Sequence, residues 1–132
     1  MKEIYELYTQ ARAGTLPTDF DQWELGSSGG LPVAHVAAIT GHLPPDFDRW
    51  DLRDDTKRTV AHEAARCGPL PPDFSLWALD ARDGWTVAHE AARFGHLPLD
   101  FDQWDLADDY GITVANTLAN TLIETLTFSR IL

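Results

Sequence analysis

The 132-residue sequence has a single cysteine, Cys67, which excludes an intramolecular disulfide and a structural zinc site built on paired thiolates. Long apolar runs are also missing, since no stretch approaches the roughly 18 apolar residues of a membrane span. The first ten residues, MKEIYELYTQ, carry charges every few positions and do not form the apolar core of a signal peptide. We therefore expect a cytoplasmic protein in a reducing compartment that does not contact membranes.

Basic residues are few: 10 lysines and arginines stand against 21 acidic residues, for a formal net charge of −11. Nucleic acids and anionic membranes are bound through cationic side chains, so this balance disfavours direct binding to either. Two interpretations of the acidity remain. It favours a partner protein with a basic surface, or it only keeps a tryptophan-rich chain soluble.

Groups that carry chemistry are equally sparse. The sequence shows no nucleophile with companions, no paired catalytic carboxylates, no phosphate-binding loop and no metal cluster. His62 and His89 each precede a glutamate, but Arg66 and Arg93 occupy the position where a second zinc-binding histidine would stand. We therefore predict that the protein is not an enzyme and needs neither a cofactor nor a metal.

What the sequence does contain is a repeat of 27 residues. The shared unit reads LPxDFxxWxL, then a polar turn, then TVAHEAARxG. The tryptophans of the repeat are Trp23, Trp50, Trp77 and Trp104, and the phenylalanines are Phe20, Phe47, Phe74 and Phe101. One such unit is too short to bury its own apolar face, so the units are expected to stack into an array.

The second half of each unit has the features of a short helix. Thr59, Thr86 and Thr113 suit helix N-caps, because a hydroxyl accepts from an otherwise unpaired backbone N–H. Gly68 and Gly95 are expected to end these helices with a positive φ. The alanines between recur at i, i+3 and i+4, which predicts a helix face of methyl groups and close stacking of neighbouring units.

The first half of each unit, LPxDFxxWxL, begins with proline, which the first helical turn tolerates. Residues 46–50 are predicted to form one to two helical turns, followed by a projecting polar turn. The expected fold is all-α, a solenoid of short helix–helix–turn repeats with helical caps. Its single domain, 1–132, divides into a first helix at about 1–14, repeats at about 15–41, 42–68, 69–95 and 96–122, and a closing helix at about 113–132.

The segment from Asp83 to Leu97, DGWTVAHEAARFGHL, resembles an ankyrin repeat, whose signature runs Asp-Gly-x-Thr-Pro-Leu-His-x-Ala-Ala-x-x-Gly-His-Leu. Nine signature positions match, and Val87 and Ala88 replace Pro-Leu. The resemblance continues more weakly through residues 59–65 and 32–38. Ankyrin units run about 33 residues, so the second helix here is expected to be shorter and the groove to differ in shape.

The resemblance implies a non-enzymatic scaffold that binds partner proteins through turn tips and the concave face of the first helices. It also implies that His35, His62 and His89 hydrogen-bond backbone in the neighbouring loop. The expected tips are Ser27 to Leu31, Asp55 to Arg58, Arg82 to Trp85 and Asp109 to Ile112. The candidate partner-binding residues are Arg58, Glu63, Arg66, Arg82, Trp85, Glu90, Arg93 and Tyr110.

Several of these candidates also have a purely structural interpretation. Trp85 stands at a turn tip of one unit only, and is either a binding hot spot or packs on the adjacent turn. The pairs Glu63/Arg66 and Glu90/Arg93 are spaced i, i+3 and are expected to form surface ion pairs of little energetic weight. They belong to the binding surface only if a partner uses them.

Two functions follow from the sequence. The first is a monomeric adaptor or inhibitor that holds one partner protein with a basic surface. The alternative is an acidic mimic of nucleic acid that inhibits a nuclease or another nucleic-acid-binding protein. Its charge ladder would be Asp19/Asp21, Asp46/Asp48 and Asp100/Asp102, interrupted in the third unit by Ser75.

Overall fold

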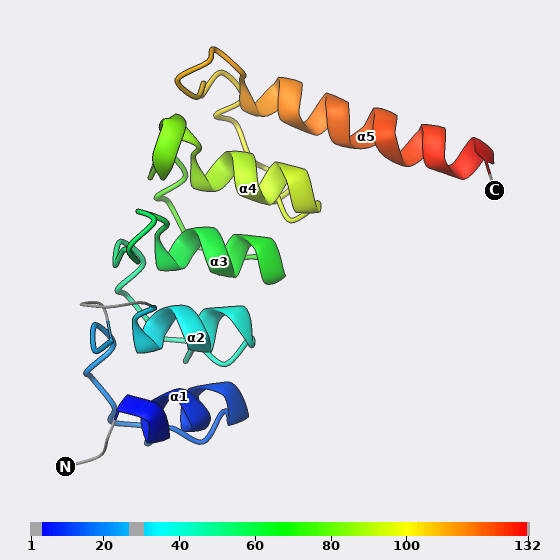
Figure 1. Cartoon of the computed structure of the whole chain (residues 1–132). Helices are drawn as coiled ribbons and strands as arrows, with labels where there is room; N and C mark the ends of the chain where they lie inside the picture. The colour runs from blue at the N-terminus through cyan, green and yellow to red at the C-terminus, as the bar shows by residue number, and fades with distance from the viewer. Residues whose placement is uncertain (1–3, 27–30, 132) are drawn as a thin grey trace.

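The computed structural model describes residues 4–26 and 31–131, with side chains inside the last helix described as far as residue 123. The helices of these residues are α1 (Ile4–Ala13), α2 (Val33–Ile39), α3 (Val60–Cys67), the 3-10 turn η1 (Arg82–Gly84), α4 (Val87–Phe94) and α5 (Val114–Ile131). The α-helices stack in chain order, each on the one before (Figure 1). The all-α prediction is confirmed for the described residues, which form no strand. The first expected tip lies outside them except for Leu31.

Threonine begins each helix from α3 onward, as predicted. Thr59 Oγ1 accepts from the backbone N–H of His62 at 3.2 Å and donates to the Nδ1 atom of the same residue at 2.7 Å. The ring nitrogen in turn accepts from the backbone N–H of Thr59 at 3.3 Å. Thr86 repeats this arrangement at α4, and Thr113 begins α5 with Asn116 in the place of the histidine. Threonine and histidine thus form a reciprocal capping box.

The remaining free N–H groups of each helix start are bound by the preceding LPxDFxxWxL segment. At α3, Val60 N donates to Leu52 O at 2.9 Å and Ala61 N donates to Trp50 O at 3.2 Å. The equivalent bonds occur at α2, α4 and α5. The first N–H groups of an α-helix have no intrahelical partner, so each segment completes the start of the helix that follows it.

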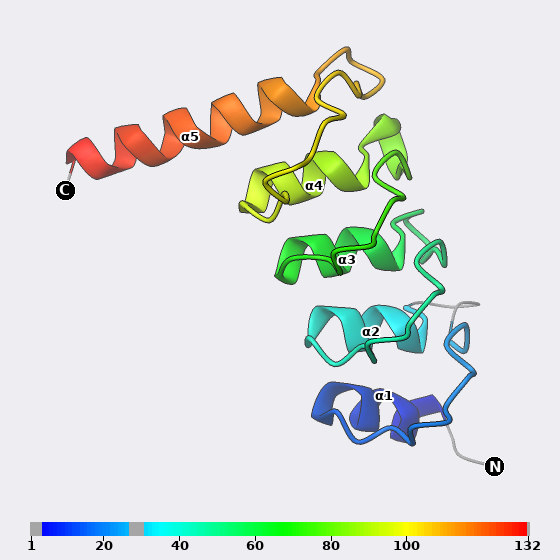
Figure 2. The same cartoon turned by 180° about the vertical axis from the view of Figure 1, so that it is seen from behind.

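The expected second helix is wrong. In place of residues 46–50 forming a helix, the segment makes two successive turns, closed by Phe47 N to Pro44 O at 3.1 Å and Leu52 N to Arg49 O at 3.3 Å. A helix would engage the Trp50 carbonyl within its own ladder, whereas here that carbonyl caps α3. Each unit is therefore one helix with a turn segment that runs along the helix row (Figure 2).

The aromatic rings of the turn segments form one continuous ladder. Trp23, Trp50 and Trp77 each contact the phenylalanine of their own unit and that of the next, and Trp104 contacts Phe101 of its own unit. These pairs are edge to face, with ring centroids 4.9 to 5.6 Å apart and interplanar angles of 82° to 89°. Such pairs contribute about 0.5–1.5 kcal/mol each beyond the area they bury. The interpretation of the tryptophans as core is confirmed for Trp23 and Trp77, while Trp104, at the end of the ladder, is 37% exposed.

The alanine faces are buried between the helices, as predicted. Ala61, Ala65, Ala88 and Ala92 are fully buried, and so is Val87 at the start of α4. Methyl groups let two helix backbones approach closely. The helix layer therefore packs through small side chains while the turn layer packs through large rings.

The helix ends follow the prediction in part. Gly95 ends α4 with φ 78°, the left-handed conformation expected of a terminal glycine. Gly68 ends α3 but is extended, with φ 179°, because Pro69 follows it and disfavours helical geometry in the preceding residue. One repeat further along, His96 stands at the position of Pro69, and its Nδ1 bonds Ala65 O at 2.8 Å, a link between units that the proline cannot make.

Helix α2 lacks the threonine of the later units. Pro32 stands at its N-cap, where it offers neither a hydroxyl nor an N–H. The ring of His35 is fully buried. Among the described residues, its Nδ1 atom has no hydrogen-bond partner. Neither of the two reciprocal bonds of the capping box is therefore present in this unit.

We expect Pro32→Thr to be more stable than Pro32→Ala by about 1 kcal/mol, because only threonine supplies a hydroxyl to His35 Nδ1 and to the helix start. Both variants remove the ring constraint of proline from the unfolded chain, so their difference isolates the hydroxyl. Urea unfolding followed by circular dichroism gives both free energies. Equal stability of the two variants would contradict this account of α2.

Candidate functional site

The loops that precede the helices are fixed by the histidines of the units before them. His35, His62 and His89 each place Nε2 against a loop carbonyl: Arg58 O at 2.9 Å, Trp85 O at 2.7 Å and Ile112 O at 2.8 Å. The expectation that these histidines bond backbone in the neighbouring loop is confirmed. A carbonyl only accepts, so Nε2 carries the hydrogen and donates it in each of these bonds.

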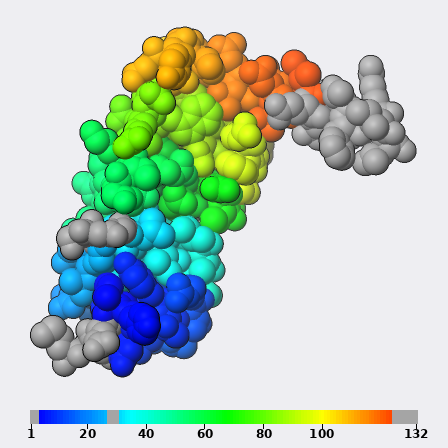
Figure 3. Space-filling model, in the orientation of Figure 1, coloured from blue at the N-terminus to red at the C-terminus, as the bar shows by residue number. Residues whose placement is uncertain are grey.

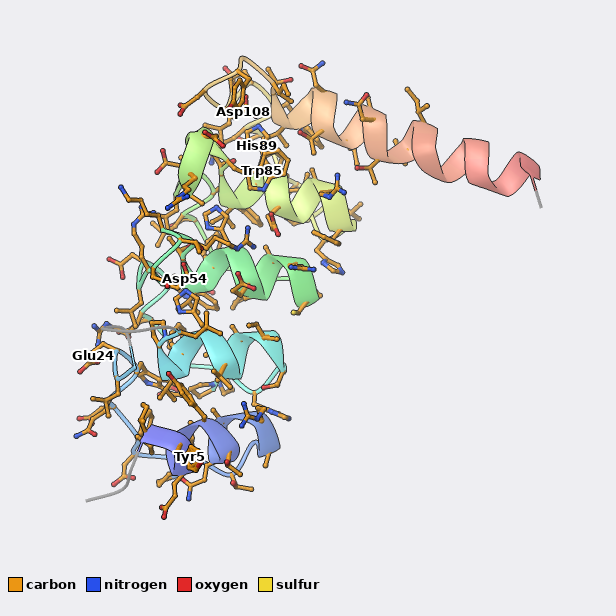
Figure 4. The ribbon with its side chains drawn as sticks, viewed as in Figure 1. Tyr5, Glu24, Asp54, Trp85, His89 and Asp108 are labelled. Atoms are coloured by element: carbon orange, nitrogen blue, oxygen red, sulfur yellow. The ribbon has the colours of Figure 1, made fainter. Side chains whose placement is uncertain are left out.

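Four of the eight candidate residues lie together at the junction of α3 and α4. Arg58 Nε donates to Glu63 Oε1 at 2.5 Å, and Arg58 Nη2 donates to Glu90 Oε1 at 2.9 Å. Trp85 Nε1 donates to the other oxygen of Glu90 at 2.5 Å, and its ring lies 4.8 Å from that of His89 (Figure 4). Glu63 and Glu90 are only 7% and 5% exposed. We call these residues, Arg58, Glu63, Trp85 and Glu90, the junction cluster.

The predicted ion pairs of Glu63 with Arg66 and of Glu90 with Arg93 are wrong, because both glutamates bind Arg58 instead. Helical side chains point back toward the N-terminus of their helix, which directs these glutamates to the loop that holds Arg58. Arg66 and Arg93 lie at the opposite ends of α3 and α4. Their guanidinium carbons sit 5.4 Å and 5.9 Å from the ring centre of the exposed Phe94.

The other four candidates are exposed. Arg66 and Arg93 flank Phe94 on the helix layer, while Arg82 and Tyr110 lie on the third and fourth loops. Tyr110 is 72% exposed, and the neighbouring Asp83 carboxylate raises the pKa of its hydroxyl. The two loops are joined by a backbone bond from Asp109 N to Asp83 O at 2.8 Å. The exposed candidates thus stand on a connected framework.

Two grooves of about 450 Å³ lie between consecutive turn segments, one at each end of the ladder. They have equivalent walls, built from aromatic, proline and aspartate side chains. The first is lined by Phe20, Asp21, His42, Asp46 and Asp48, and the second by Phe74, Ser75, His96, Asp100 and Asp102. These grooves were not predicted from the sequence. The proline and aspartate that recur in each LPxDFxxWxL segment were the feature that could have indicated them.

Comparison with known protein families and with curated proteins finds no match for this chain. The structure itself defines the class: a helical repeat protein with units of about 27 residues and a periodic aromatic cluster. In the part of the chain that is described, no helix is long and apolar enough to cross a membrane. The same part contains no group of three or more side chains suited to holding a metal ion.

The buried His62 makes the free energy of unfolding dependent on pH. Burial lowers the pKa of His62, and the nearby Arg58 guanidinium adds to this, although the bond to the Trp85 carbonyl opposes it. An unfolded histidine takes up a proton below about pH 6.5, and the folded ring resists it. The unfolded state therefore binds more protons, and the free energy of unfolding falls as the pH decreases below that value.

We expect this loss to be smaller in His62→Gln, because glutamine retains capping ability without a titrating ring. Urea unfolding of both proteins at about pH 7.5 and about pH 5 measures it. Acid also reduces the repulsion among the many carboxylates in both proteins. The quantity compared is therefore the slope, that is, the change in the free energy of unfolding between the two pH values. Identical slopes for His62→Gln and the wild type would rule out this role.

Removing the cation of the junction cluster should be costly. We expect Arg58→Met to lower the free energy of unfolding by about 2–4 kcal/mol, because it leaves two buried carboxylates without a cation. Glu90 keeps only its bond from Trp85 Nε1. Arg49→Met removes an exposed pair with Glu24 at 3.6 Å and should cost less than about 1 kcal/mol. Chemical denaturation measures both. Adding Glu63→Gln and Glu90→Gln to Arg58→Met should recover stability, and failure to do so would contradict the electrostatic explanation.

Proposed function

We propose that the chain is a shortened ankyrin-like solenoid that binds a partner protein, as an adaptor or an inhibitor, without catalysing a reaction. The partner has a basic surface. Recognition uses the exposed loop tips and the exposed face of the helices. The similarity of residues 83–97 to the ankyrin signature supports the assignment, together with the capping box and the histidine-to-loop bonds described above.

The observation that carries this proposal is the division of the surface. The alanines, threonines and histidines that the units share serve packing and capping, as the buried histidines and alanines show. Residues that belong to single units, such as Arg82 and Tyr110, are exposed on loops held by a histidine of the preceding unit. A rigid framework that presents variable side chains is suited to recognition, since function resides in sites placed on a fold.

The charge distribution supports a basic partner. The aspartates of the turn segments are exposed, and none forms an ion pair among the described residues. Two of them, Asp46 and Asp48, line the first groove, and Asp100 and Asp102 line the second. Carboxylates left without internal cations attract a positively charged surface and accelerate its association.

The same exposed aspartates favour the second candidate function, a mimic of the nucleic-acid backbone that blocks a nuclease or another nucleic-acid-binding protein. The two functions differ in what determines binding. A mimic depends on the sum of its charges and is displaced by salt, whereas an adaptor depends on particular side chains at the tips.

The test is capture of the partner from the native lysate on the immobilised full chain, followed by affinity measurements with two variants. Arg82→Ala/Tyr110→Ala removes two exposed tip residues, and Asp46→Asn/Asp48→Asn/Asp100→Asn/Asp102→Asn removes charge from both grooves. Gln22→Ala, at an exposed position of the first turn segment, is the control. We expect the tip variant to weaken binding about tenfold or more, and the groove variant to slow association.

Competition and salt separate the alternatives. If duplex DNA displaces the chain and the affinity falls steeply between about 50 mM and 200 mM salt, the mimic is correct. If both variants bind like the control, neither the tips nor the grooves form the binding surface and the proposed site is wrong.

A further inference from the structure

The two ends of the array are not equivalent. Helices α2, α3 and α4 each have two packed faces. The face toward the previous helix carries Val33 or its equivalent, and the face toward the next helix carries Ala34 and Ala38 or their equivalents. All of these residues are buried. We call the second surface the forward face. The first and last helices each have one neighbour, so they show which face a terminal helix leaves open.

At the N-terminal end, the open face is polar. In α1, Leu7 and Ala11 occupy the forward positions and are 4% and 0% exposed against α2. The opposite positions, equivalent to Val33 and Ala37, hold Glu6 and Gln10. This helix therefore closes its end of the array with hydrophilic side chains, as a terminal repeat requires.

At the C-terminal end, the open face is apolar. In α5, Val114 is fully buried and Thr117 is 6% exposed against α4. The forward positions hold Ala115 and Ala119, which are exposed, and Leu122 extends the same stripe at i+7 with 54% exposure. The sequence continues a packing surface at this end instead of capping it.

Helix α5 is longer than the helices before it. It has 18 residues, against 7 or 8 in α2, α3 and α4, and so extends about 27 Å. Its second half projects beyond the end of α4 in both views (Figures 1 and 2). The space-filling view shows the described part of α5, in orange, lying across the end of the stack (Figure 3).

We propose that the forward face of α5 packs against the forward face of α5 in a second copy of the chain, forming a two-fold symmetric dimer. Within the array a forward face packs on the face of the next helix that carries Val33 or its equivalent, whereas the proposed contact pairs two forward faces. The monomer expected from the sequence is thereby replaced by a pair of arrays joined at their C-terminal ends. This inference does not depend on the proposed partner surface.

Charge and symmetry select a second copy as the occupant. Each chain has a net charge of −11, yet residues 110–123 contain no charged side chain, so two chains meet there with little repulsion. Head-to-tail addition would place the polar outer face of α1 on the apolar stripe, which is a poor match. A two-fold contact pairs the stripe with itself and closes at two subunits.

Sedimentation analysis of the full chain at concentrations from about 1 µM to 200 µM tests the dimer. We expect a mass that rises from the 14.7 kDa of one chain to twice that value and then stops. Ala119→Glu places a charge in the stripe and should give one chain at all concentrations, with unchanged circular dichroism. Asn120→Glu introduces the same charge one residue further along the same helix, outside the stripe, and should still dimerise.

Three results would overturn the proposal. A wild-type mass of 14.7 kDa throughout would show that this face does not bind a second copy. A mass that keeps rising past two chains would indicate an open, head-to-tail contact. Equal weakening by Ala119→Glu and Asn120→Glu would place the contact elsewhere or attribute it to net charge alone.

Discussion

The hydrogen bonds of one histidine ring hold each unit to the next. In α3, the Nδ1 atom of His62 completes the capping box with Thr59, and Nε2 donates to the carbonyl of Trp85 in the following loop. The ring must be neutral and in one tautomer to do both. A helix start, a loop and an interface between units therefore depend on one buried side chain.

The features that could be predicted from the sequence are those that depend on neighbouring residues or on positions that recur in every unit. Threonine caps, alanine faces and the tryptophan core follow from local chemistry and from the period. The second helix could not be decided in this way. Residues 46–50 have the composition of a helical turn, but the carbonyl of Trp50 binds Ala61 N of α3. The first N–H groups of the next helix need acceptors outside that helix, and the carbonyls of this segment supply them only when the segment forms turns. The choice between helix and turn is therefore a tertiary effect.

The junction cluster was also beyond sequence reasoning. Glu63 and Arg66 satisfy the i, i+3 rule for surface pairs, yet the glutamate is buried and binds Arg58, and Arg58 also reaches Glu90, 32 residues away. The spacing rule describes solvated helices and does not consider a loop folded over the helix start. Four residues chosen because they stood at turn tips or on the expected concave face of the helices proved to be bonded to one another, whereas Arg66, Arg82, Arg93 and Tyr110 remained exposed.

The links between units are unequal along the chain. Helices α3 and α4 are joined by the bond from His62 to the Trp85 carbonyl, by the bond from His96 to the Ala65 carbonyl and by the Arg58 bridge. Between α2 and α3, Pro69 takes the place of the second histidine. Because such arrays are stabilised mainly by nearest-neighbour contacts, α3 and α4 form the firmest part. The exposed candidates lie on this pair of helices and the loops that follow, so they are presented already ordered, and binding them costs less conformational entropy.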